Sequence, residues 1–233
     1  MSTRAAAGSS FLSGVEQAPA DPILGVSVAF RESTNPNKLN LGVGAYRTED
    51  LKPYVLDVVR QAEKRMIEAD FDKEYLPMQG LAEFNEATRK LLLGEGSAAI
   101  AESRVATVQS LSGTGSLRVG AAFIAKFMPG AVVYLPNPTW GNHNNIFADA
   151  GVEWREYRYY DKATIGLDLD GMIADLKAAP RGSVICLHGC AHNPTGVDPT
   201  KEQWAAVADA VEANGLVPFF DVAYQGFASG SLE

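Results

Sequence analysis

The chain has 233 residues, of which 46% are hydrophobic, and its formal net charge at pH 7 is -8. This length suffices for one large domain, or for one domain and part of another. The negative charge and the lack of any long run of lysine or arginine argue against a broad nucleic-acid-binding surface. No apolar stretch approaches the roughly 20 residues of a membrane-spanning helix, so we expect neither nucleic acid nor a membrane as a partner.

Two cysteines, Cys186 and Cys190, follow one another closely at the end of an apolar run. Such a pair is more often two reduced thiols than a disulfide, so we predict a reducing compartment, with the cytoplasm first. The N-terminal segment carries Arg4, several serines and alanines, and no acid before Glu16. We interpret it as a disordered tail; the alternative is a transit peptide to a chloroplast or mitochondrion.

The first 50 residues are expected to form an irregular N-terminal arm. Pro19, Pro22 and Pro36 favour an extended chain with one short helix near the segment PILGVSVAFR. Beyond the arm, the helical spacing of apolar residues predicts helices over 55–69 and 80–94.

From about residue 105, strand-like and helix-like segments alternate. The expected strands are 105–111, 131–135, 153–160, 183–187 and 216–221. The expected helices are 116–128, 142–151, 168–179 and a last one that begins after Thr200, in capping-box spacing with Gln203, and ends at Gly215. Five strands alternating with helices predict an α/β domain with a mostly parallel sheet.

The polar residues that follow each strand are candidate ligand-binding groups, because ligands of open α/β sheets bind beyond the carboxyl ends of the strands. Ser112, Gly113 and Thr114 follow the first strand and precede a helix. Hydroxyl groups and backbone N–H groups at a helix N-terminus can hold a phosphate. The alternative is a tight turn with a serine or threonine cap. The segment is not a P-loop, since no Gly-Lys-Ser/Thr follows it.

The later strand ends carry a flat ring, an amide, a carboxylate and a phenol. Trp140 either stacks on a planar ligand or covers the end of the sheet, and His143 beside it is more often structural than catalytic. Asn193 is suited to aim an amide at a ligand. Asp221 either pairs with a protonated ring nitrogen or caps the next turn, and Tyr224 follows it.

The spacing of residues disfavours two other kinds of site. His188, Cys190 and His192 would form a metal site, but their spacing is too tight for the usual zinc patterns, so no metal is expected. A nicotinamide-binding site is disfavoured because the glycines after the first strand do not match the dinucleotide fingerprint. No acid lies about 20 residues further on to hold a ribose.

Together, these strand ends suit a planar, phosphorylated heterocycle with a protonated ring nitrogen. Pyridoxal 5'-phosphate is such a molecule, and it needs a carboxylate beside its pyridine nitrogen to act as an electron sink. We therefore predict a pyridoxal-phosphate site at this edge of the sheet.

Six segments then carry a family resemblance: LNLGVGAYRTED, EYLPMQGLAEF, QSLSGTGSLRVGA, NPTWGNHNNIF, GCAHNPTGVDPTKEQW and FFDVAYQGFASG. In this order they resemble the aspartate aminotransferases of the fold type I pyridoxal-phosphate family, from about residue 15 to the last residue. The resemblance implies a mostly parallel sheet with flanking helices, in which 51–233 are a truncated large cofactor-binding domain. It also implies that 1–50 are the N-terminal arm and the start of the small domain.

The resemblance implies the following roles around the cofactor. Ser112, Gly113 and Thr114 match the phosphate-binding turn, and Tyr75 matches a tyrosine that reaches the phosphate of the neighbouring subunit. Trp140 matches the ring that stacks on the cofactor and contacts substrate.

The remaining matched residues surround the ring of the cofactor. Asn193 and Tyr224 match the partners of its phenolic oxygen, with Asn193 also close to substrate, and Asp221 matches the partner of its pyridine nitrogen. His143 and His188 resemble residues that orient this aspartate. Gly44 matches a backbone contact to substrate.

The implied reaction is reversible amino transfer from L-aspartate to 2-oxoglutarate, which gives oxaloacetate and L-glutamate, in a homodimer. The family's Schiff-base lysine and its carboxylate-binding arginines correspond to sequence beyond residue 233. The nine lysines present lie in polar loops or on helix faces. We therefore expect a fragment that is inactive alone, has poor stability, and lacks the neighbours of the strand at 105–111. The alternative is a natural short product without enzymatic activity that pairs with a full-length subunit.

Overall fold

The computed structural model describes residues 10–16, 22–40, 42, 44–227 and 229–232. These residues belong to two compact units, Met1–Glu74 and Tyr75–Glu233. The sequence suggested a boundary after residue 50. The structure instead includes α2 (Asp57–Glu68) in the first unit, and this helix buries none of its residues.

The described residues of the first unit form three helical segments, of which two were expected from the sequence. These are η1 (Phe11–Gly14), α1 (Pro22–Glu32) and α2. The Lys38 ammonium group donates to the carbonyl oxygens of Phe30 and Ser33, each at 2.6 Å. It thereby satisfies carbonyl groups at the C-terminus of α1 that have no partner within the helix.

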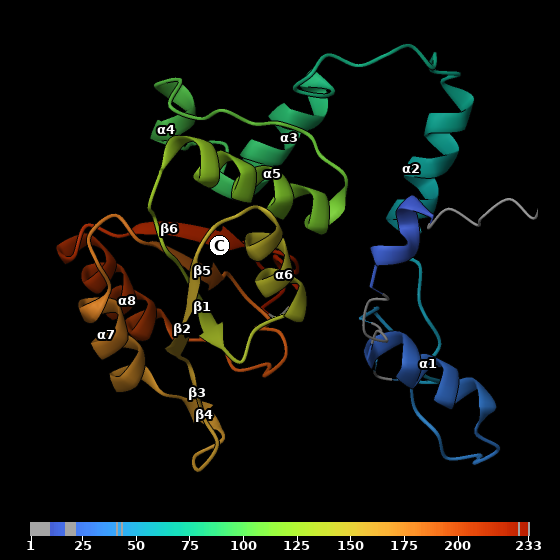
Figure 1. Cartoon of the computed structure of the whole chain (residues 1–233). Coiled ribbons are helices and arrows are strands. Elements are labelled where there is room, and N and C mark those ends of the chain that lie inside the picture. Colours follow the sequence, from blue (N-terminus) through green and yellow to red (C-terminus); the bar gives the residue numbers. More distant parts are fainter. Residues whose placement is uncertain (1–9, 17–21, 41, 43, 228, 233) are drawn as a thin grey trace, which may run out of the picture. The chain divides into compact units, whose positions relative to one another are not determined.

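From α5 (Ser112–Phe127) onward, the second unit alternates helices with the strands of its main sheet (Figure 1). Its helices are α3 (Ala82–Leu93), α4 (Ala98–Ala101), α5 (Ser112–Phe127), α6 (Gly141–Asp149), α7 (Leu169–Ala178) and α8 (Lys201–Ala213). Its strands are β1 (Val133–Asn137), β2 (Trp154–Arg158), β3 (Tyr160–Asp161), β4 (Gly166–Leu167), β5 (Val184–His188) and β6 (Val217–Asp221). The predicted capping box at Thr200 and Gln203 begins α8.

Four strands form a parallel sheet in the order β2-β1-β5-β6, which confirms the predicted parallel α/β architecture. The predicted strand over 105–111 is wrong: this segment is not a strand. It has strand-like composition, but the described residues offer it no neighbouring strand, and a strand is defined by its ladder of hydrogen bonds. The predicted strand over 153–160 is divided, because β2 ends at Arg158 and Tyr160 pairs instead with Leu167 in a small antiparallel hairpin.

The sheet is covered on both faces by helices, as Figure 1 shows for α7 and α8 on one face and α6 on the other. Alternate residues of β5 separate the two layers, since successive side chains of a strand point to opposite faces. Ile185 and Leu187 join the cluster with α7 and α8. Val184 and Cys186 join the cluster with α5 and α6. This three-layer core holds the carboxyl ends of β1, β5 and β6 in place.

Candidate functional site

A cavity of about 450 Å³ lies at the carboxyl ends of β5 and β6 and beside the N-terminus of α5. Seven of the residues singled out from the sequence line it: Ser112, Gly113, Trp140, His188, Asn193, Asp221 and Tyr224. They come from four separate segments of the chain, which the sheet topology brings together at the carboxyl ends of the strands.

Four other residues singled out from the sequence lie elsewhere. Thr114 is exposed on the first turn of α5, one residue beyond the lining glycine. His143 is fully buried behind the cavity. Tyr75 is 97% exposed and does not line the cavity. Gly44 belongs to the first unit, where it is exposed.

The N-terminus of α5 lines the cavity through Ser112 and Gly113. No side chain caps this helix: Leu111 occupies the cap position. The first backbone N–H groups of a helix have no partner within it, and the helix dipole favours an anion there. Ser112 has a positive φ of 56°, which is uncommon for a residue with a side chain and is found more often at functional sites. The turn therefore has the character of an anion-binding site.

A close helix–strand contact holds α5 against β6. The ring of Phe219 lies so near Gly120 that a Cβ placed at this glycine would be 2.8 Å from it. Glycine at this position permits the approach, and the N-terminal turn of α5 lines the same cavity as the residues that follow β6.

Asp221 ends β6 with one carboxylate oxygen occupied by a buried histidine. His143 Nε2 is 2.9 Å from Asp221 Oδ2. The histidine side chain is fully buried, whereas the aspartate side chain keeps 28% of its surface exposed. The hydrogen bond from His143 lowers the pKa of Asp221, an effect that burial partly opposes. Asp221 is therefore a carboxylate at neutral pH. It presents this negative charge at the wall of the cavity.

A chain of four hydrogen bonds runs from the Asn193 backbone to Asp221. The Asn193 N–H donates to His188 Nδ1 at 3.2 Å, and His188 Nε2 lies 3.3 Å from Thr139 Oγ1. Thr139 Oγ1 lies 2.8 Å from His143 Nδ1, and His143 Nε2 completes the chain at Asp221.

The direction of this chain follows from its first member, because a backbone N–H can only donate. His188 Nδ1 must accept, so a neutral His188 carries its proton on Nε2 and donates to Thr139. The Thr139 hydroxyl then donates its hydrogen to His143 Nδ1, which leaves the His143 proton on Nε2, facing Asp221. Both histidines are thus assigned the Nε2–H tautomer by the network.

Burial keeps His188 neutral. Burial, together with smaller contributions from His192 and His143, lowers the pKa of His188 to about 3. A neutral His188 can accept from Asn193 and donate to Thr139 at the same time, as the chain requires.

Thr139 is a site residue that the sequence analysis missed. It stands between Pro138 and Trp140 in the loop after β1, and its hydroxyl links two histidines that are 45 residues apart in the numbering, 143 and 188. Its position directly after a strand was the available signal, but a single threonine in a loop has many other uses.

The structure also changes which residues are candidate metal ligands. Among the described residues, the one group that could hold a metal is His143, Cys186 and His188, whose ligand atoms lie within 4.8 Å of one another, rather than His188, Cys190 and His192. The ring nitrogens of both histidines already serve the hydrogen-bond chain. Burial raises the pKa of the Cys186 thiol, so a thiolate ligand is disfavoured.

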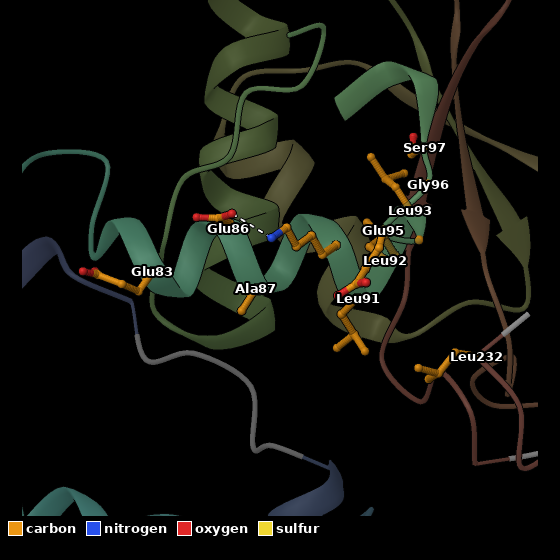
Figure 2. A pocket seen from close by; sticks show the side chains of 12 residues that line it. Glu83, Glu86, Ala87, Leu91, Leu92, Leu93, Glu95, Gly96, Ser97 and Leu232 are labelled. Carbon is orange, nitrogen blue, oxygen red and sulfur yellow. Dashed lines mark ion pairs between the residues drawn. The ribbon is translucent and has the colours of Figure 1, made fainter. Parts of the chain in front are cut away.

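A larger cavity, of about 1060 Å³, lies beside α3 (Figure 2). Figure 2 shows Leu91, Leu92 and Leu93 at the end of this helix, with Leu232 nearby. Two of its four charged lining residues, Glu86 and Lys90, pair with each other at 2.8 Å along the helix. Size alone therefore does not identify the site: the smaller cavity is the one where a carboxylate, an amide, a phenol and a helix N-terminus converge.

Within the described parts of the chain, no helix is long and apolar enough to cross a bilayer.

Comparison with known proteins agrees with the geometry of the site. Residues 36–233 match the family model described as aminotransferase class I and II. The chain therefore belongs to the class I and II aminotransferase family.

Relatives named aspartate aminotransferase resemble the chain over nearly its whole length. A chloroplastic enzyme of Arabidopsis thaliana is 65% identical over 94% of this chain and 49% of its own length. A mitochondrial enzyme of Lupinus angustifolius is 63% identical over 98% of this chain and 50% of its own. A cytoplasmic enzyme of Oryza sativa subsp. japonica is 57% identical over 97% and 56%. The chain thus spans about half the length of these relatives.

Solved structures show the same fold. An aromatic-amino-acid aminotransferase from Burkholderia pseudomallei, covalently bound to pyridoxal phosphate, superposes with a TM-score of 0.89 at 49% identity over 94% of this chain and 55% of its own. The cytoplasmic aspartate aminotransferase of Saccharomyces cerevisiae gives 0.91 at 42% identity over 97% and 55%. The fold type I architecture predicted from the sequence is confirmed.

Proposed function

We propose that this chain is the cofactor-binding half of a pyridoxal-phosphate-dependent aspartate aminotransferase. The reaction would be the reversible transfer of the amino group from L-aspartate to 2-oxoglutarate, which gives oxaloacetate and L-glutamate. The observation that carries the proposal is the Asp221 carboxylate, oriented by buried His143, at the wall of a cavity that also contains a helix N-terminus and Trp140.

The residues present fit this cofactor by their chemistry. The uncapped first turn of α5, with Ser112, Gly113 and Thr114, suits a phosphate group. A cavity of about 450 Å³ lies within the size range of small-ligand sites. A carboxylate that remains ionised while partly buried suits a protonated ring nitrogen.

Each residue would have a separate task. Asp221 Oδ2 is occupied by His143, so Oδ1 is available to hold the proton at the ring nitrogen. The amide of Asn193 and the hydroxyl of Tyr224 would donate to the phenolic oxygen, and Asn193 would also lie close to substrate. The ring of Trp140 would cover one face of the ligand and exclude water there. When bound, pyridoxal phosphate supplies the electron sink that allows the Cα–H bond of the amino acid to break.

The lining residues of the described cavity include no lysine and no arginine. A transaminase site needs a base for the Cα proton and cations for the substrate carboxylates. We propose that these groups come from the part of the relatives' length that this chain does not match. Gly44, in the first unit, would contribute a backbone contact to substrate, and Tyr75 would reach the phosphate of a second subunit in a homodimer.

The compartment is proposed to be the cytoplasm, on the basis of the free thiols of Cys186 and Cys190. Relatives are named for the cytoplasm, the mitochondrion and the chloroplast, so this proposal needs its own test. Fractionation of cells that express the complete protein, followed by immunoblotting, would decide among the three compartments.

Cofactor binding tests the proposal at its first step. Bound pyridoxal phosphate absorbs near the tryptophan emission, so we expect saturable quenching of tryptophan fluorescence when it is titrated into the purified chain. The Trp140→Phe variant should lose most of this quenching, whereas Trp204→Phe, which lines a different cavity, should retain it. Equal loss from both variants, or no saturable quenching, would contradict the assigned site. Formation of oxaloacetate from aspartate and 2-oxoglutarate by the complete protein tests the reaction.

A further inference from the structure

His192 is a buried histidine that the proposed cofactor chemistry does not use. It lies in the loop between β5 and α8, directly before Asn193, and its residue exposure is 2%. Its ring is stacked between two others, with centroids 3.8 Å from Tyr159 and 4.2 Å from His188. The stack joins the end of β2, the loop and the end of β5.

The backbone around His192 is held at several points. The N–H groups of Ala191 and His192 donate to the two carboxylate oxygens of Asp198 at 2.7 and 2.9 Å. Gly196 N–H donates to His192 O at 2.7 Å, and the Tyr159 hydroxyl donates to Val197 O at 2.6 Å. The loop that carries Asn193 is thereby closed onto the same tyrosine that stacks on His192.

The surroundings of the His192 ring suit a neutral imidazole. Nδ1 lies 2.8 Å from Thr195 Oγ1, while Nε2 is buried and has no hydrogen-bond partner. An imidazolium would need acceptors at both nitrogens. The groups that face the ring are Tyr159, His188 and Thr195, and Asp198 binds the backbone rather than the ring. Burial, together with repulsion from His143, lowers the pKa of His192 to about 4.

We propose that His192 is a positioning residue of this site, whose neutral ring holds the loop against His188 so that the Asn193 N–H reaches His188 Nδ1. Since that N–H sets the direction of the hydrogen-bond chain, His192 acts on Asp221 through His188, Thr139 and His143 without touching the ligand. The benefit of this positioning role rests on the proposed function of the cavity. The contacts that hold His192 in place do not involve a ligand.

A matched pair of variants of the full chain tests the role of the ring. His192→Phe keeps a flat ring for the stack. His192→Leu fills the same buried position with an apolar side chain that has no ring. The readout is the nitrogen-15 chemical shift of each ring nitrogen of His143 and His188, which reports the tautomer. We expect wild type and His192→Phe to show the Nε2–H form at both rings, and His192→Leu to show averaged tautomers at His188.

The same variants should differ in binding of pyridoxal phosphate. His192→Leu is expected to weaken it by about tenfold, the effect of about one lost hydrogen bond, and His192→Phe by much less. An unchanged tautomer pattern in a folded His192→Leu variant would overturn the inference, as would a His192→Phe variant that behaves like His192→Leu. If circular dichroism shows that His192→Leu does not fold, His192→Met, which also removes the ring from the stack, takes its place, and unchanged His188 shifts there would be equally adverse.

The two proposals fail in different ways. Wild-type chain with the Nε2–H pattern at both histidines but no affinity for pyridoxal phosphate would refute the proposed function and support the positioning role. Normal cofactor binding with no tautomer preference at His188 would refute the positioning role alone.

Discussion

His143 and Asp221 stand 78 residues apart in the chain, yet His143 Nε2 donates to Asp221 Oδ2 over 2.9 Å. The contact ties the first turns of α6 to the end of β6. It occupies one carboxylate oxygen and leaves the second for a ligand. The aspartate is thus held in one orientation before any ligand arrives, which reduces the ordering that binding would otherwise require.

Removing the charge of Asp221 should weaken cofactor binding. In Asp221→Asn the side chain keeps its shape and can still accept from His143, but it no longer attracts a protonated ring nitrogen. Hydrogen bonds to charged groups contribute about 1.5–3 kcal/mol, so we expect a loss of affinity for pyridoxal phosphate of tenfold or more, measured by equilibrium dialysis. Asp209→Asn, on the exposed side of α8, is the control. Equal affinity in both variants would argue against Asp221 as the partner of the ring nitrogen.

Thr139 should prove important for stability as well as for the site. Thr139→Val keeps the volume but leaves His143 Nδ1 and His188 Nε2 without their shared partner. An unsatisfied buried polar group costs about 1–3 kcal/mol, and urea unfolding should show a loss of this size in the free energy of unfolding. Thr139→Ser restores the hydroxyl and should recover most of it. A valine variant as stable as wild type would mean that the hydroxyl is dispensable.

Acid should destabilise the second unit in the window from about pH 6.5 to about pH 4. The pKa values of His188 and His192 in the folded chain are about 3 and about 4, below the ordinary value of 6.5. In this window the unfolded chain binds protons that the folded chain does not, so the free energy of unfolding falls as pH decreases, by about 1.4 kcal/mol for each unit of pKa shift. The lowered pKa of Asp221 adds a further loss only below about pH 3.8.

The measurement is urea unfolding at pH 7 and at pH 5, in wild type and in the His188→Gln and His192→Gln variants. Wild type should lose more stability between the two pH values than either variant does. A wild-type chain whose free energy of unfolding is the same at both values, while folded at both, would show that these histidines are not buried in neutral form.

Gly120 should tolerate no side chain. A Cβ at this position would lie 2.8 Å from the Phe219 ring, and overpacking of this kind costs about 1–3 kcal/mol. Gly120→Ala should therefore lower the thermal midpoint and, by shifting α5, weaken phosphate binding at its N-terminus. Gly141→Ala is the matched control, because a Cβ there meets nothing within 4 Å. Similar effects from both substitutions would point to a general effect of replacing a helical glycine rather than to the contact with Phe219.

The strand ends could be predicted from the sequence because their signals are local. Apolar runs followed by polar residues marked Asp221 and Asn193, and the parallel topology then required them to meet at one edge. The hydrogen-bond chain could not be predicted in this way. The tautomers of His143 and His188 depend on where the Asn193 N–H points, which is a property of the folded loop.

In the segment 105–111, by contrast, a local sequence signal led to a wrong prediction. Its alternation of small, β-branched and polar residues predicts a strand, and that prediction fails. The composition of a strand is local, but its hydrogen-bond ladder needs a neighbour, and none of the described residues supplies one. The contact between Tyr159 and His192 was equally hidden, because nothing in the sequence relates two residues that stack only after the sheet has formed.

The position of β6 in the sheet has a further consequence. Its partner is β5 on one side, and no described strand pairs with its other side. Val217 and Phe220 are 37% and 52% exposed along it. Pro218 removes one N–H donor from β6, but an open strand edge flanked by apolar side chains is still a template for strand addition. The monomeric fraction of the chain will therefore depend on its concentration. Light scattering over a series of concentrations should accompany each binding experiment, so that the monomeric fraction is known.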